Sequence, residues 1–176
     1  TSTAVHRHDE DCDPHLWLAP PLMAEIAGKC AAALRELYPA DQELIATALA
    51  TTLEKINALH ENITDRLKPL AGATMLVYHP SWGHFADTYG LHQLAIEDDG
   101  KPPSARHLAK INAHVKETGA QILFSNPDAP EAVVRRAARM LKCRVVTIDP
   151  LAANWDENLL ATATLIATET TKQGAP

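Results

Sequence analysis

The fold is decided by Met75-Leu76-Val77-Tyr78-His79-Pro80-Ser81-Trp82-Gly83-His84-Phe85, an apolar run that ends in a histidine and a proline. Residues 74–78 are rich in β-formers and too few for a helix, which predicts a buried strand. Pro80 cannot continue a strand ladder, and we expect Ser81 to cap a short helix over 82–89. His79 therefore ends a strand, where open α/β sheets place their ligand sites. Taken alone, a histidine that merely bonds a nearby carbonyl is the commoner explanation.

Two helices are predicted before this strand. Pro20 and Pro21 suit a first helical turn, and apolar residues at helical spacing follow as far as Leu37. A second apolar stripe, from Leu44 to Leu67, predicts one long helix. Because that helix exceeds the usual globular length, we interpret it as a strut along a domain or between two.

Strands and helices alternate after residue 78. Further strands are expected over 91–97, with alternating polarity, over 121–124 and over 143–148; helices are expected over 104–118, capped by Ser104, over 126–141 and over 156–170. The β-branched run at 143–148 is typical of a central parallel strand. This order predicts an α/β fold with a four-stranded, mainly parallel sheet, flanked by helices and preceded by the long backbone helix.

The same reading divides the chain into four regions. They are a flexible histidine- and acid-rich loop (1–14), a helical linker with the long helix (15–72), an α/β lobe (73–170) and a disordered tail (171–176).

Composition excludes several functions. The formal net charge of −6 and the lack of a basic stripe argue against nucleic-acid binding. No apolar run has the length needed to cross a membrane. The three cysteines, Cys12, Cys30 and Cys143, have no CxxC spacing and do not settle the redox compartment.

Three positions carry side chains that bind metals. Asp149 follows the last strand as His79 follows the first, and the carboxyl ends of parallel strands share one edge, so we expect these two to share a ligand. His15 precedes Leu16-Trp17-Leu18, an apolar junction that can fix its ring. Two imidazoles and a carboxylate suit zinc or manganese.

The polar start of the chain offers further ligands. His6, His8 and Cys12 are candidates for weak, auxiliary metal binding, although a solvated acidic arm explains His6 and His8 slightly better.

The order of motifs is more specific than any one of them. Asp13-Pro14-His15-Leu16-Trp17-Leu18 is followed by the long helix, Tyr78-His79-Pro80-Ser81-Trp82-Gly83-His84-Phe85, Tyr89-Gly90-Leu91, Pro103-Ser104 and Thr147-Ile148-Asp149-Pro150-Leu151. From about Cys12 to Ala167 this resembles the zinc/manganese solute-binding proteins of bacterial ABC transporters, the TroA-like or ZnuA-like family.

The resemblance implies a function and a site. Family members have two α/β lobes joined by a long rigid helix and hold the metal between them. His15 matches the ligand of the DPHxW element, His79 the second-lobe ligand and Asp149 the carboxylate ligand. His84 and Trp82 are expected beside the ligands. The cargo is expected to be zinc, with manganese the second choice, the partner a membrane permease and the location periplasmic or otherwise extracytoplasmic.

One departure from the family is large, because its first lobe, which normally supplies another histidine, has no counterpart here. The sequence leaves open a fragment or a half-size protein, and His6, His8, a second chain or water as the fourth ligand. The uncovered apolar faces lead us to expect a homodimer. A zinc-dependent hydrolase, a stand-alone zinc buffer or metallochaperone, and a purely structural module remain alternatives, although no HExxH-type arrangement supports the hydrolase.

Overall fold

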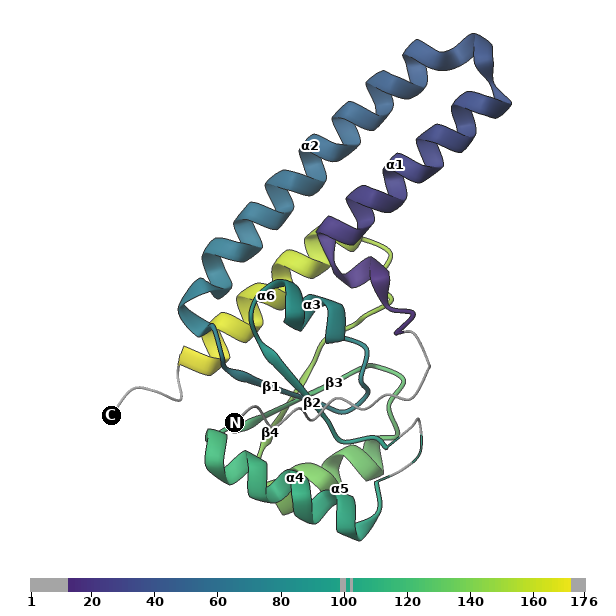
Figure 1. Cartoon of the computed structure of the whole chain (residues 1–176). Coiled ribbons are helices and arrows are strands. Elements are labelled where there is room, and N and C mark those ends of the chain that lie inside the picture. The colour runs from purple at the N-terminus through teal and green to yellow at the C-terminus, as the bar shows by residue number, and fades with distance from the viewer. Residues whose placement is uncertain (1–12, 99–100, 102, 172–176) are drawn as a thin grey trace, which may run out of the picture.

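A four-stranded parallel sheet forms the centre of the protein, as shown by a computed structural model that describes residues 13–98, 101 and 103–171 (Figure 1). The strands are β1 (Thr74–Val77), β2 (His92–Ala95), β3 (Ile122–Ser125) and β4 (Arg144–Thr147), in the order β2-β1-β3-β4. Every pair is parallel, with Val77 opposite both Ala95 and Phe124, and Ser125 opposite Thr147. The predicted α/β class and parallel sheet are confirmed.

Helices cover both faces of the sheet (Figure 1). One face carries α4 (Ala105–Thr118) and α5 (Glu131–Leu141), and the other carries α3 (Gly83–Thr88), α6 (Trp155–Thr171) and the second half of α2 (Gln42–Leu67). The two faces of each strand therefore enter different cores: Leu76 packs with α4 and α5, whereas Met75 and Val77 pack with α2 and α6.

A helical hairpin extends away from the sheet (Figure 1). It consists of α1 (Pro20–Leu37), a 3-10 turn (Pro39–Asp41) and the first half of α2, which is 26 residues long. Buried residues of α2 begin only at Ile56, while Leu37 and Leu44 near the tip are 72% and 69% exposed. Within the described part of the chain, no helix combines the length and apolar character needed to span a membrane.

The prediction that 143–148 forms a central strand was wrong. β4 is an edge strand, and Val145 is 37% exposed. A β-branched run predicts that the backbone is extended. It does not predict whether the strand pairs with one other strand or with two.

Two local predictions also differ from the structure. Ser81 is buried and makes no cap, because α3 begins one residue later than predicted and Trp82 occupies the capping position. The second strand is shorter than predicted, and its residues are one exposed and three half-buried, without alternation. It is an edge strand, so neither face is fully covered. By contrast, the Ser104 hydroxyl does accept the His107 N–H and caps α4.

Candidate metal site

The His15 ring is held by a carboxylate two residues earlier. Asp13 Oδ1 accepts the His15 backbone N–H at 3.0 Å and the ring Nδ1–H at 2.7 Å. A carboxylate accepts hydrogen bonds, so this contact assigns the ring proton to Nδ1 and leaves Nε2 as a lone-pair donor. The 3-10 turn Leu16–Leu18 follows at once, with Leu18 buried in the core. The apolar junction thus anchors the segment that carries His15.

His79 is held in the same way by a residue from the neighbouring strand. Its Nδ1 lies 2.5 Å from Glu97 Oε2, and Glu97 lies two residues after the end of β2. The side chain of His79 is 38% exposed and that of Glu97 only 14%. Burial, and after it the charge of the nearby Glu97 carboxylate, raise the pKa of Tyr78.

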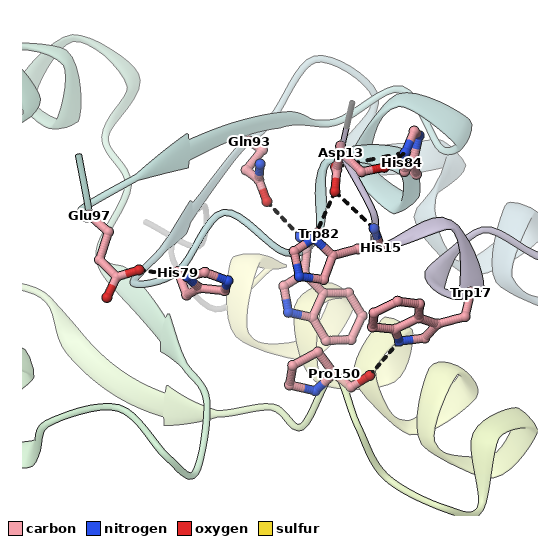
Figure 2. A network of polar contacts seen from close by, with 9 residues as sticks. All are labelled: Asp13, His15, Trp17, His79, Trp82, His84, Gln93, Glu97 and Pro150. Carbon is pink, nitrogen blue, oxygen red and sulfur yellow. Dashed lines mark hydrogen bonds and ion pairs between the residues drawn. The ribbon is translucent and has the colours of Figure 1, made fainter. Parts of the chain in front are cut away.

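The two histidine rings lie side by side although 64 positions separate them in sequence. Their centroids are 5.5 Å apart with the planes at 78°, and Figure 2 shows each ring with its carboxylate partner. Imidazoles that donate Nδ1–H to a carboxylate and offer Nε2 are the usual form of histidine at metal centres. In the neutral form, each ring therefore offers Nε2 as a lone-pair donor, as a histidine ligand does.

Asp149 lies on the same edge of the sheet but not beside the two rings. Its Oδ1 accepts the Leu151 N–H at 2.8 Å, which stabilises the turn after β4, and its carbonyl accepts from Asn158 at 2.7 Å. β3 separates β1 from β4, which spaces these strands about 10 Å apart. Across the described residues no three His, Cys, Asp or Glu side chains are grouped closely enough to hold one ion. The role of Asp149 as a metal ligand stays a prediction.

Two tryptophans tie the His15 segment to the Asp149 loop. The Trp17 indole N–H donates to the Pro150 carbonyl at 2.8 Å (Figure 2), and the Trp155 indole N–H donates to the Trp17 carbonyl at 2.6 Å. The Trp17 ring also lies 5.3 Å from the His15 ring, centroid to centroid. These contacts hold the backbone next to His15 against the backbone next to Asp149, which are two of the three predicted ligands.

His84 and Trp82 were expected beside the ligands. The ring of His84 donates Nε2–H to the Asp13 carbonyl at 3.0 Å, so it supports the residue that orients His15. Trp82 is buried in the core against Phe85, and its backbone N–H donates to Gln93 Oε1 at 2.7 Å. The auxiliary candidates His6, His8 and Cys12 lie outside the described residues.

Sequence reasoning missed three residues at this site. In the sequence, Asp13 stands out only as part of the DPHxW element, and Glu97 only as the end of a predicted strand. A signal for Glu97 did exist, because the residues after two neighbouring parallel strands meet at one edge. Gly83 carried no signal, yet a Cβ there would lie 2.8 Å from Asp13 Oδ2.

A cavity of about 490 Å³ lies elsewhere on the molecule, between the end of β3, the start of α5 and β4. Its walls include Asn126, Val134 and Val145 and none of the three predicted ligands. This cavity is therefore separate from the histidine pair.

Comparisons with known proteins agree with this architecture. The family model described as zinc-uptake complex component A, periplasmic (ZnuA) matches residues 2–168. The high-affinity zinc uptake system protein ZnuA of Yersinia pestis is 28% identical over 151 residues, which are 85% of this chain and 47% of that protein. The zinc-binding protein AdcA of Streptococcus pyogenes serotype M1 is 26% identical over 82% of this chain and 28% of its own length. The chain thus spans less than half the length of these curated relatives.

Solved structures show the same fold. A crystal structure of ZnuA has a TM-score of 0.84 and 34% identity, covering 89% of this chain and 62% of that one. The laminin-binding protein Lbp of Streptococcus pyogenes has a TM-score of 0.79 and 26% identity, covering 89% and 63%. With nearly the whole chain matched by the family model, this protein belongs to the family of zinc-uptake complex component A, the periplasmic ZnuA family.

Proposed function

We propose that this chain binds zinc as cargo, as the metal-holding part of a solute-binding protein that delivers the ion to an ABC transporter. The observation that carries the proposal is the pair of neighbouring imidazoles, each with Nδ1 held by a carboxylate. Membership of the ZnuA family and the zinc named for its relatives support the same cargo.

In this proposal Nε2 of His15 and Nε2 of His79 bind the ion at about 2.0–2.1 Å, and Asp149 supplies the third ligand. Two nitrogen ligands favour zinc over manganese, which prefers oxygen. Asp149 would exchange its hydrogen bond with the Leu151 N–H for the ion, or share one oxygen with each. The ion undergoes no chemistry, so no general acid or base is needed.

The partner and the location follow from the family. We propose a permease of the ABC type as the partner and an extracytoplasmic location, because relatives are named as periplasmic or as a lipoprotein. We also propose that the chain is not an enzyme, since those relatives are named for zinc binding and uptake. The expected homodimer stays a prediction, which sedimentation with and without zinc would check.

The test is zinc binding by single variants. We expect the unaltered chain to bind one zinc ion tightly and His15→Ala and His79→Ala to lose at least about tenfold in affinity, with Asp149→Ala weakened as well. His114→Ala is the matched control, because His114 is an exposed histidine on α4 that also faces a carboxylate, Glu117 at 3.8 Å. Chelator competition measures all of them.

Two results would decide against the proposal. Equal affinity in His79→Ala and His114→Ala would remove the histidine pair from the site. Hydrolysis of ester or peptide substrates that depends on added zinc would favour the hydrolase alternative instead.

A further inference from the structure

We propose that Glu97, with Tyr78 behind it, is the positioning residue that keeps His79 ready for the metal; this inference rests on the proposed zinc function. Neither residue is a predicted ligand, and Glu97 contacts Nδ1 of His79, which leaves Nε2 for the metal. The arrangement runs from the core to the site: buried Tyr78 precedes His79 in sequence and its carbonyl accepts the Glu97 backbone N–H, and the Glu97 carboxylate holds the His79 imidazole.

The contact between Glu97 and His79 is short and shielded. An Nδ1 to Oε2 distance of 2.5 Å is at the short end for a charge-assisted hydrogen bond. The carboxylate side is 14% exposed, so little water competes for it. In a neutral imidazole only one ring nitrogen carries a proton. A carboxylate can only accept a hydrogen bond, so the neutral His79 ring that faces Glu97 carries its proton on Nδ1.

Glu97 cannot easily swing away from this position. Its backbone N–H donates to the Tyr78 carbonyl at 2.9 Å, which continues the β1–β2 pairing past the last strand residues. Tyr78 is 2% exposed, and after burial itself the nearby Glu97 carboxylate raises the pKa of the Tyr78 hydroxyl. If the mostly buried Glu97 carboxylate moved away from His79 Nδ1–H, it would lose that hydrogen bond without gaining water, at a cost in free energy.

The consequence is a ring fixed before the ion arrives. His15 depends on Asp13, which is a close neighbour in sequence and 31% exposed, whereas His79 depends on a separate strand. Carboxylate partners of this kind typically contribute 10- to 100-fold in metal affinity, because they fix the tautomer and make Nε2 a better donor.

The first experiment needs no metal. Nitrogen-15 NMR of the full chain, at a pH where His79 is neutral, reports which ring nitrogen carries the proton. We expect the Nδ1–H form in the unaltered chain and in Glu97→Gln, whose amide oxygen still accepts, and loss of that form in Glu97→Ala. An unchanged His79 tautomer in Glu97→Ala would overturn the proposal. Should Glu97→Ala fail to fold, Glu97→Leu with Glu97→Gln as its reference replaces it.

The second experiment measures zinc affinity by chelator competition. We expect a 10- to 100-fold loss in Glu97→Ala, a smaller loss in Glu97→Gln and in Tyr78→Phe, and none in Glu117→Ala. Glu117 is the matched control because it is an exposed glutamate beside a histidine, His114, outside the site. Equal affinity in Glu97→Ala and the unaltered chain would also overturn the proposal. If the unaltered chain binds no zinc, the proposed function fails, and the tautomer alone still decides whether Glu97 positions His79.

Discussion

At the scale of single residues, the site depends on carboxylates that hold rings. Asp13 holds His15 and Glu97 holds His79, and both contacts leave Nε2 free to serve as the metal ligand in the proposed site. The sequence indicated the histidines because they stand at a motif and at a strand end. For the partners, a signal existed only for Glu97, which follows a strand that can neighbour the His79 strand. None existed for Asp13, since an acidic residue in a polar stretch is ordinarily solvated.

Gly83 is the residue whose substitution tests this dependence. A methyl group there would lie 2.8 Å from Asp13 Oδ2, so Asp13 must shift and His15 loses its fixed orientation. We expect Gly83→Ala to weaken zinc binding severalfold while thermal unfolding changes little, because alanine also favours the helix by up to about 1 kcal/mol. Chelator competition and a melting curve measure the two effects.

Gly28→Ala is the matched control for this substitution. Gly28 lies within α1, where a Cβ would meet no atom within 4 Å. It should raise stability by about 0.5–1 kcal/mol and leave zinc affinity unchanged. If Gly83→Ala also kept full affinity, the position of Asp13 would not matter to the metal.

At the scale of elements, helix ends divide into those that local sequence sets and those that packing sets. Ser104 caps α4 because it precedes an exposed helix start, where nothing competes for its hydroxyl. Ser81 also has a hydroxyl but is 1% exposed, and the neighbouring Trp82 backbone N–H already donates to Gln93 Oε1. A capping motif therefore predicts a helix start well at the surface and poorly inside a core.

The long helix α2 offers a matched pair of leucines. Leu67 is 0% exposed and belongs to the core of the sheet, whereas Leu44 is 69% exposed near the hairpin tip. We expect Leu67→Ala to cost about 2–5 kcal/mol of unfolding free energy and Leu44→Ala less than about 0.5 kcal/mol. Denaturant titration measures both. Comparable losses would mean that the hairpin tip is buried in solution by a contact outside the described residues.

At the scale of the whole molecule, the alternation of strands and helices was enough to predict the α/β class. Crossover helices make a parallel sheet the natural arrangement, and the structure has four parallel strands. The order of those strands was not predictable. The run at 143–148 was assigned to the centre from its apolar character, but β1 and β3 are the strands with two neighbours. Strand order depends on contacts between distant segments, which the local pattern does not encode.

The indole contacts of Trp17 and Trp155 give a testable order of events in refolding. They join positions 133 and 138 residues apart, while β1 pairs with β2 across fewer than 20. Closing the longer loops costs more entropy. We therefore expect backbone amides of β1 to gain protection from hydrogen exchange before the two indole N–H groups do, in pulse-labelled refolding followed by NMR. Simultaneous protection would contradict this order.

The same contacts have a consequence for the chain as it leaves the ribosome. Synthesis delivers Trp17 early and Pro150 late, so while some 130 residues are added the His15 segment is held only through Leu18 and through the contact between His84 and Asp13. During that interval β1, β2 and β3 can already assemble, and His79 can already meet Glu97. The candidate site thus matures in two stages: His79 is fixed with the sheet, whereas the His15 segment gains its contacts with Pro150 and Trp155 only when the start of α6 has been made.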